Sequence, residues 1–269
     1  MTQISRLAGR GVIGISGSDR VSFLNGLVSN DVALVAPGQA VWAALLSPQG
    51  RYISDFFIFT DENRLLLDAP RAMVADLLRR LARFRLRAQV ELQDLSESLQ
   101  VYAAWAGMPP AVPVTAPDPR LELAGCRMLS AEPIETNASE AAYDAHRLSL
   151  GLPDGPPDLE PDKTLLLEAG FDELHGIAWD KGCYMGQELT ARTKYRGLVK
   201  RRLVPVTMQE PPPAPGTPVM ADGSEVGTLR SSAGQIGLAM LRIDALKKPL
   251  IAGNALVTPN LPGWMNLRA

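Results

Sequence analysis

The residues best suited to chemistry lie together in one stretch, Lys181 to Glu188, which reads Lys-Gly-Cys-Tyr-Met-Gly-Gln-Glu. It contains the thiol of Cys183, with glycines at 182 and 186 on either side. Glycine permits a positive φ and a close approach of the backbone to another surface, both of which a Cβ resists. The composition therefore predicts a shaped loop, in place of a plain helix, that presents a cysteine.

Two basic residues bear on the chemistry of Cys183. Lys181 precedes the thiol and Arg192 follows it within one short segment. A nearby cation favours the thiolate, the form that acts as a nucleophile or a metal ligand. We therefore predict Cys183 and Lys181 as the catalytic residues. The alternative is that Cys183 is a small buried hydrophobe in a tight turn.

The remaining candidate metal ligands are few. Cys126 has no motif spacing with Cys183 and lies in a short apolar strand candidate, so a buried and inert thiol is expected. One cysteine cannot supply the ligands of a stable iron–sulfur cluster, and no stably bound metal is predicted. The two histidines, His146 and His175, lack metal-ligand spacing and are expected to be structural or exposed.

The composition of the whole chain limits the possible classes of protein. Its 269 residues are 46% hydrophobic and carry a net charge of −2, which is typical of a globular protein of two or three modules. This charge provides no general attraction to nucleic acid or membrane. With two cysteines, no signal-peptide core and no apolar run of membrane-spanning length, we expect a cytoplasmic protein with reduced thiols.

An α+β unit is expected over residues 1–95. A helix capped by Ser18 or Asp19 follows its first strand, and apolar residues at helical spacing predict an amphipathic helix over 71–86. Its expected strands lie at residues 12–16, 41–46, 52–59, 65–67 and 89–92. This order of elements suggests a split α+β sheet.

A second and weaker round of the same order is expected over residues 96–198, as an imperfect duplication. Strand candidates at 99–105 and 126–129 precede a helix that Ser139 caps. The proline-rich segment 108–119 between these strands reads as a linker or extended loop.

The pattern changes after residue 198. Short alternating strands separated by turns predict a small β-barrel or sandwich over residues 199–269. The predicted fold class is therefore α+β, with two α+β units and a C-terminal β-barrel.

The motif at Lys181–Glu188 resembles the signature of the YgfZ-type folate-binding proteins, which are relatives of the glycine-cleavage T-protein, an aminomethyltransferase. The extension Leu189–Thr193 and the stretch Lys200–Leu203 are most similar to the branch that assists iron–sulfur cluster assembly. Further, individually weak matches occur at Asn25–Val32 and Leu46–Arg51. The resemblance covers nearly the whole chain.

This resemblance implies a three-lobed ring of two ferredoxin-like units and a β-barrel, with tetrahydrofolate or a one-carbon derivative in the central cavity. It implies that Cys183 is needed for maturation or repair of iron–sulfur proteins and, in some bacterial members, for related tRNA thiolation. The implied partners are folate, iron–sulfur assembly or client proteins and, indirectly, tRNA, with no membrane. Around Cys183 and Lys181, the motif loop comprises Gly182, Tyr184, Gly186, Gln187, Glu188 and Arg192.

The chain departs from the T-protein at one position. The Arg-Leu-Glu-Ala-Gly-like segment of that enzyme corresponds to Arg147–Gly151, where Ser149 replaces the acid. A serine cannot act as a carboxylate at neutral pH, so aminomethyl transfer is not expected. Tyr143, one turn earlier, matches an aromatic that contacts folate in YgfZ-type proteins. It either stacks on a pterin or packs in the core.

The polar residues of the motif and the run after it have open interpretations. Gln187 and Glu188 either orient the loop by hydrogen bonds to its amides or bind a ligand, and orientation is favoured. The basic run is either a solvated connector or a surface for folate carboxylates, an acidic partner or RNA phosphates. Its members are Arg192, Lys194, Arg196, Lys200, Arg201 and Arg202.

These observations favour a folate-binding accessory protein for assembly or repair of iron–sulfur proteins. It is expected to act through Cys183 and not as an ordinary turnover enzyme. Two alternatives remain open. One is a folate-dependent one-carbon transferase with an altered acid, and the other is an RNA- or protein-docking factor, related to tRNA modification, that uses the basic run.

Overall fold

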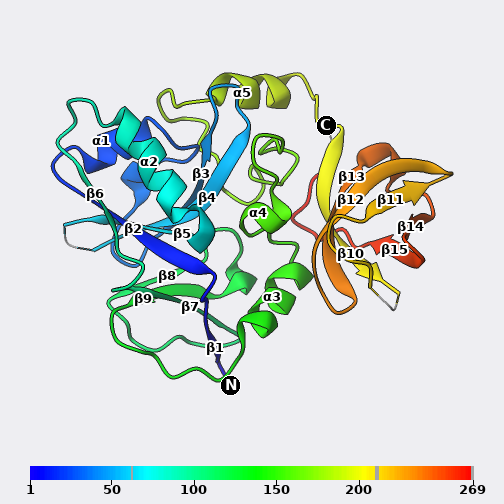
Figure 1. Ribbon diagram of the computed structural model, residues 1–269, viewed down its shortest axis with the longest axis horizontal. Helices are drawn as coiled ribbons and strands as arrows, with labels where there is room; N and C mark the ends of the chain where they lie inside the picture. The colour runs from blue at the N-terminus through cyan, green and yellow to red at the C-terminus, as the bar shows by residue number, and fades with distance from the viewer. Residues whose placement is uncertain (62, 210–211, 268–269) are drawn as a thin grey trace.

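The computed structural model describes residues 1–61, 63–209 and 212–267. Figure 1 shows two sheets on one side of the molecule and a closed barrel on the other. Helices α3 (Glu140–Ser149) and α4 (Gly155–Asp158) lie between them. Residues 210, 211, 268 and 269 of the predicted barrel segment lie outside the described residues.

The first sheet is antiparallel, with the strand order β3-β4-β5-β2-β6. Its strands are β2 (Arg10–Ser16), β3 (Val41–Leu46), β4 (Tyr52–Thr60), β5 (Leu65–Pro70) and β6 (Glu91–Asp94). Helices α1 (Arg20–Asn25) and α2 (Val74–Phe84) pack on one face of it. A 3₁₀ turn, η2 (Arg71–Met73), begins the segment predicted as one amphipathic helix.

Both faces of the first sheet are buried, and β4 shows how. Successive side chains of a strand point to opposite faces. Phe56 and Ile58 pack with the helices, while Phe57 and Phe59 join the core shared with the second sheet. The strands therefore read as continuous apolar runs.

The side-chain cap expected for α1 is not formed by Asp19. Its carboxylate instead accepts a hydrogen bond from the Gln89 amide at 2.8 Å.

The second sheet has the order β1-β7-β9-β8. Its strands are β1 (Gln3–Arg6), β7 (Gln100–Trp105), β8 (Val114–Pro117) and β9 (Cys126–Ser130). The linker predicted at 108–119 therefore contains an edge strand, where a proline is tolerated because its missing amide can face away from the sheet. The Ser139 cap is confirmed, since its hydroxyl accepts a hydrogen bond from the Ala142 amide at 3.1 Å.

The C-terminal part forms a closed barrel with the order β10-β13-β12-β11-β14-β15. Its strands are β10 (Arg201–Met208), β11 (Pro218–Ala221), β12 (Ser224–Ala233), β13 (Ile236–Arg242), β14 (Leu250–Ala252) and β15 (Ala255–Pro259). Alternate residues such as Val204 and Val206 form its own apolar core. Closure leaves no unpaired edge in this barrel.

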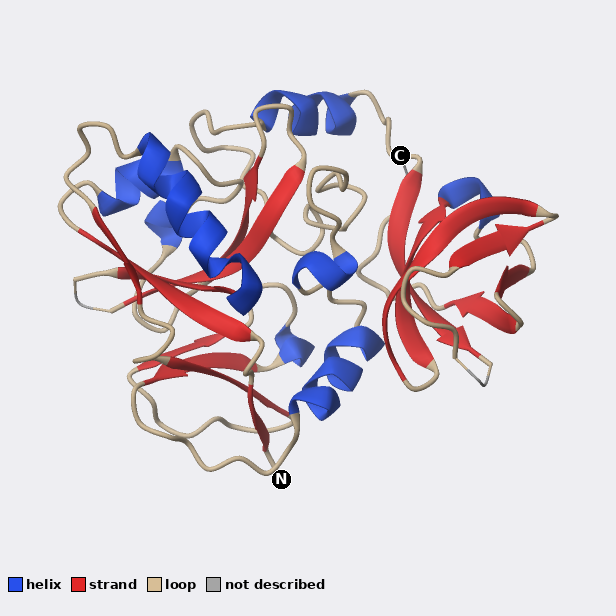
Figure 2. Cartoon of the chain, viewed as in Figure 1, coloured by secondary structure: helices blue, strands red, loops and turns tan. Residues whose placement is uncertain are grey.

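The α+β class with a C-terminal barrel is confirmed, and Figure 2 shows the two sheets on one side, the barrel on the other, and helices between the sheets and the barrel. The boundaries at 95/96 and 198/199 remain predictions. Within the described parts of the chain, no helix has the length and apolar character needed to cross a membrane.

Candidate functional site

The motif stretch lies where the chain enters helix α5 (Gln187–Tyr195), which runs along the upper edge of the molecule in Figure 1. Residues 181–186 are loop, as predicted, whereas Gln187 and Glu188 form the first turn of α5. The loop therefore ends at Gly186, whose φ of 81° places it in the left-handed region.

Lys181 anchors the start of this loop. Its ammonium donates hydrogen bonds to the carbonyl oxygens of Asn25, Val28 and Asn30 at 2.7, 2.8 and 2.7 Å. An ammonium has three donors, so these bonds use all of them. Burial lowers the pKa of Lys181 to about 8, and the Asp31 carboxylate opposes that shift. The structure gives Lys181 a positioning contact, and a role toward Cys183 remains a prediction.

The residues next to Asn25 hold the chain just before the motif. The Ser29 hydroxyl donates to the Gly176 carbonyl at 2.7 Å, and the Ala178 amide donates to the Ser29 carbonyl at 3.0 Å. The Asn30 side-chain amide donates to the His175 carbonyl at 2.7 Å. The weakly matching segment 25–32 therefore fixes the position of the chain just before residues 181–186, which we call the cysteine loop. The sequence alone did not reveal this role.

The end of the loop packs against the turn after β3. A Cβ on Gly186 would lie 2.6 Å from the Ser47 carbonyl oxygen and 3.0 Å from the Cα of Gly50. A Cβ on Gly50 would lie 2.8 Å from the Gly186 carbonyl oxygen, so the two glycines permit the contact. Gly182 differs, because its φ is not positive and nothing lies within 4 Å of its Cβ position. The loop therefore requires glycine at 186 and not at 182.

Tyr184 and Gln187 fix the middle of the loop. The Tyr184 side chain is buried, and its ring centroid lies 5.2 Å from the Lys181 ammonium. Burial raises the pKa of Tyr184 to about 12. The Gln187 side-chain oxygen accepts a hydrogen bond from the Tyr184 amide at 3.3 Å, the orienting contact favoured for it above.

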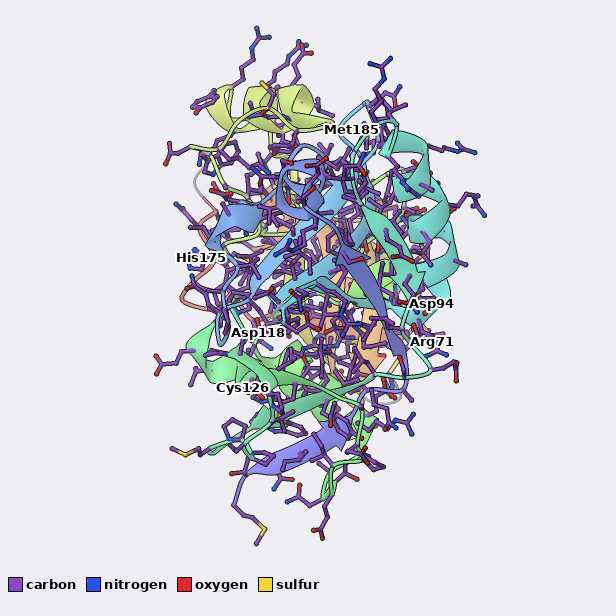
Figure 3. All side chains as sticks on the ribbon, turned by 90° about the vertical axis from the view of Figure 1, so that its left-hand side faces the viewer. Arg71, Asp94, Asp118, Cys126, His175 and Met185 are labelled. Carbon is purple, nitrogen blue, oxygen red and sulfur yellow. The ribbon has the colours of Figure 1, made fainter. Side chains whose placement is uncertain are left out.

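Cys183 is exposed on this anchored loop, and so are Glu188 and Arg192. The expected burial of Cys126 is wrong, because this residue begins β9 at the end of the sheet and is only partly buried. Its partial burial raises the pKa of the Cys126 thiol, and the negative charge of Asp118 raises it further. Figure 3 shows Met185 and Cys126 well apart, so the two cysteines belong to different places on the molecule.

The two histidines have different surroundings. His146 stacks on Trp105, and its ring Nε2 lies 3.0 Å from the Leu123 carbonyl oxygen. Burial lowers the pKa of His146. His175 is exposed at a φ of 57°. Among the described residues, no group of three or more histidine, cysteine or acidic side chains is arranged to hold a metal ion.

A cavity of about 490 Å³ opens beside the loop, on the side of Lys181. Its polar lining includes Asn30, Asp31, Asp180 and Lys181, with Trp179 at the wall. The sequence did not predict this cavity, because its walls come from segments far apart in the chain. The signal that could have found it was the pair of matching segments at 25–32 and 181–188.

The basic run divides into two sets. Lys194 lies 3.1 Å from the Asp172 carboxylate and 3.8 Å from the Trp179 ring centroid. Arg202 is buried and pairs with Glu173 at 2.7 Å. The other four are exposed, and no salt bridge joins them to an acid in the described part of the chain. They are Arg192, Arg196, Lys200 and Arg201.

The two positions associated with folate lie away from the loop. Tyr143 is only 3% exposed, and its hydroxyl accepts a hydrogen bond from Arg127 at 2.8 Å. Burial raises the pKa of the Tyr143 hydroxyl, and the positive charge of Arg127 opposes this rise. Ser149 is exposed at the end of α3 and donates to its own helix, at the His146 carbonyl 2.7 Å away. It borders a cavity of about 370 Å³ that also includes Trp264.

The architecture of two sheets and a closed barrel is the fold of the glycine-cleavage aminomethyltransferase. The glycine cleavage system aminomethyltransferase T from Bartonella henselae superposes with a TM-score of 0.77 at 15% identity, over 99% of this chain and 87% of that chain. Residues 200–267 match the family described as the CAF17 C-terminal beta-barrel domain.

The similar sequences define the family more narrowly. The mitochondrial iron–sulfur cluster assembly factor IBA57 homolog of Mycosarcoma maydis is 33% identical, covering 91% of this chain and 75% of the relative. The mitochondrial IBA57 proteins of Mus musculus and Homo sapiens are each 31% identical, covering 84% and 79% of the relative. The chain belongs to the IBA57 family. The resemblance to the iron–sulfur assembly branch is thereby confirmed.

The expected cytoplasmic location is wrong. The relatives from Mycosarcoma maydis, Mus musculus and Homo sapiens are all described as mitochondrial. Composition and net charge bear on solubility and association and do not encode a compartment. Composition and charge therefore could not distinguish a cytoplasmic from a mitochondrial protein.

Proposed function

We propose that this protein is an accessory factor for the assembly or repair of iron–sulfur proteins and acts through the thiol of Cys183. The observation that carries the proposal is an exposed cysteine on a loop whose two ends are anchored. Lys181 fixes the start and Gly186 fixes the end, so the thiol has a defined position without being buried. Membership of the IBA57 family supports the same function.

A single thiol cannot hold a cluster alone, so a cluster at Cys183 would be shared with a second protein. An iron–sulfur cluster as a whole is held by four cysteine thiolates in most proteins. Cys183 can supply one of them, and Cys126 lies elsewhere on the molecule. The remaining ligands must come from an assembly or client protein. A link to tRNA modification would then be indirect, through an iron–sulfur enzyme that modifies tRNA.

Complementation tests this proposal. In a strain that lacks the gene, we expect wild-type protein to restore the activity of an iron–sulfur enzyme and Cys183→Ala to lose most of it. Cys126→Ala is the matched control, because it also removes one thiol, and should restore activity fully. Immunoblots would verify equal protein levels. Full restoration by Cys183→Ala would exclude a function through this thiol.

The described residues do not fit tetrahydrofolate at the positions that the resemblance assigns to it. The Tyr143 side chain is buried against Arg127 and Trp105, and the cavity that it borders measures only about 170 Å³, below the roughly 300–1,000 Å³ of pockets that hold small-molecule ligands. Ser149 has no carboxylate, and its hydroxyl is already bonded within α3. The similarity to an aminomethyltransferase at 15% identity concerns the fold alone.

A titration decides whether folate has a place in the function. We expect tetrahydrofolate to cause no saturable change in tryptophan fluorescence up to near-millimolar concentration. The bacterial aminomethyltransferase would serve as the positive control for the ligand. Saturable binding that Tyr143→Phe leaves intact and a bulky Ser149→Trp removes would show that the cavity beside Ser149 binds folate after all. Methylene transfer by the bound protein would then support the transferase alternative.

A further inference from the structure

A groove of about 620 Å³ lies at the base of the barrel, where the chain leaves α5 and enters β10. One wall is Val199–Arg201, and the other is formed by Arg242 and the 3₁₀ turn η4 (Ile243–Ala245). The Ile243 amide donates to the Lys200 carbonyl at 3.0 Å, which joins the two walls. Val199 and Ile243 are half-buried, so the groove has an apolar component between charged rims.

The charge of this groove is positive. Arg242 is paired with Asp244, but Lys200 forms no salt bridge with any residue that the structure describes. Burial raises the pKa of Glu168, and Arg201 opposes this rise. The Glu168 carboxylate therefore partly balances the positive charge of Arg201. The chain as a whole has a net charge of −2, so the positive charge here is local.

The exposed side of α5 continues this positive surface toward the cysteine loop. The helix exposes Arg192 and Tyr195, the latter by 77%, and just beyond it Arg196 and Leu198 are exposed, Leu198 by 46%. One acid, Glu188, is exposed in its first turn. The helix has 9 residues, which corresponds to about 13 Å at the rise of an α-helix. Figure 3 shows long side chains projecting outward from α5 at the top of the molecule.

We propose that this groove and the exposed side of α5 bind an extended acidic segment of the protein that supplies or receives the cluster at Cys183. The identity of that partner rests on the proposed function, whereas the binding of an acidic segment does not. Exposed arginine and tyrosine side chains are the types enriched at protein interfaces. Opposite charge on the partner would speed the encounter and orient it along α5.

The same observations disfavour RNA as the occupant. A nucleic-acid surface usually belongs to a strongly basic domain, whereas this chain has more acidic than basic residues, 29 against 27. The positive side chains here also alternate with exposed apolar ones, Tyr195 and Leu198. An acidic segment with apolar residues would match both features.

Fluorescence anisotropy with a labelled twelve-residue peptide of glutamate, aspartate and leucine tests the inference on the full chain. We expect the triple variant Arg196→Glu, Lys200→Glu, Arg201→Glu to bind this peptide at least about tenfold more weakly than wild type. The matched control is Arg83→Glu, Arg85→Glu, Arg87→Glu, which reverses three exposed arginines near the end of α2 and changes the net charge equally. Circular dichroism would verify that both variants fold.

Each result has a definite meaning. Equal weakening in the two triple variants, or no binding by wild type at low salt, would overturn the inference. Tighter binding of a twelve-nucleotide single-stranded RNA, lost in the Arg196 triple variant, would overturn it in favour of nucleic acid. Cys183→Ala should keep peptide binding, and the triple variant should keep full reaction of Cys183 with Ellman's reagent. The measurements therefore distinguish a groove that does not bind the acidic segment from a Cys183 thiol that lacks the proposed function.

Discussion

At the scale of single residues, the cysteine loop depends on Lys181 more than its spacing suggests. In sequence, a lysine two positions before a thiol reads as an activating cation. In the fold, its three donors bind three carbonyl oxygens of residues 25–30. Asn25 is the last residue of α1, where helix carbonyl oxygens need a partner from outside the helix, and Val28 and Asn30 lie in the segment that follows it. The lysine therefore ties two distant segments together.

Removal of this lysine should destabilise the protein. We expect Lys181→Met to lower the free energy of unfolding by about 2–4 kcal/mol, because three charge-assisted hydrogen bonds are lost and carbonyl oxygens remain partly buried. Lys247→Met is the control, since Lys247 is exposed, and should stay within about 0.5 kcal/mol of wild type. Urea denaturation followed by tryptophan fluorescence measures both. Coincident curves for the two variants would show that the anchor contributes nothing.

At the scale of elements, the two motif glycines are distinguished only by what the fold brings next to them. Gly182 and Gly186 are equivalent candidates in the sequence, and each flanks Cys183. The turn at Ser47–Gly50, more than a hundred residues earlier, meets only Gly186. This contact could not be predicted from spacing, because it depends on where β3 ends in the folded sheet.

A pair of alanine substitutions measures this difference. Gly186→Ala should lower the free energy of unfolding by about 2 kcal/mol or more, because it strains a positive φ and forces a Cβ against the Ser47 carbonyl. Gly182→Ala should change it by less than about 0.5 kcal/mol, since its Cβ would meet open space. The same urea measurements apply. Similar losses in both variants would mean that the loop requires flexibility at either glycine and not a specific contact.

The spacing of apolar residues predicted those helices and strands that are determined by residues close together in the sequence. The apolar residues Val74, Leu77 and Leu81 recur at helical spacing, and they form the buried side of α2. Strand β1 escaped prediction because it is short and half-buried, and its partner β7 lies about a hundred residues away. Strand β8 was hidden by prolines that an edge position tolerates.

At the scale of the whole molecule, a network of buried ion pairs connects the three bodies. Asp68 of β5, with no exposed side-chain surface, accepts hydrogen bonds from Arg10 of β2 and Arg127 of β9 at 2.6 and 3.1 Å. Arg147 of α3 pairs with Asp158 of α4 at 2.7 Å. Asp158 also accepts a hydrogen bond from Ser231 of the barrel. Buried charges of this kind are costly unless every member is paired.

The sequence could not reveal this network. Its partners are separated by 58, 59 and 144 residues in the pairs Arg10–Asp68, Arg127–Asp68 and Arg10–Asp154. In sequence, each residue is an ordinary charged side chain that is expected on the surface. Only the packing of the two sheets and α3 places them together. The resemblance to known proteins predicted the three bodies and not what joins them.

The network makes the stability of the protein sensitive to acid. Burial alone would raise the pKa of Asp154, but Arg10, Arg127 and Arg147 hold it well below its ordinary range. An aspartate in the unfolded chain has a pKa of about 3.9. Between the two pKa values the unfolded chain binds more protons, so stability rises with pH there. The contribution of Asp154 is therefore complete above about pH 5 and is lost as the pH falls toward the lower value.

Asp154→Asn tests this dependence, because it removes the charge and keeps the shape. At pH 7 we expect the variant to be less stable than wild type by about 2–4 kcal/mol, since its three guanidinium neighbours lose their shared carboxylate. The difference should shrink as the pH is lowered from about 5 to 2, because protonation gives the wild type a neutral side chain too. Urea denaturation at several pH values measures the gap. Asp244→Asn, which removes an exposed carboxylate paired with Arg242, should show little change at any pH. A gap for Asp154→Asn that stays constant with pH would show that this carboxylate does not titrate with unfolding, and that acid acts elsewhere in the molecule.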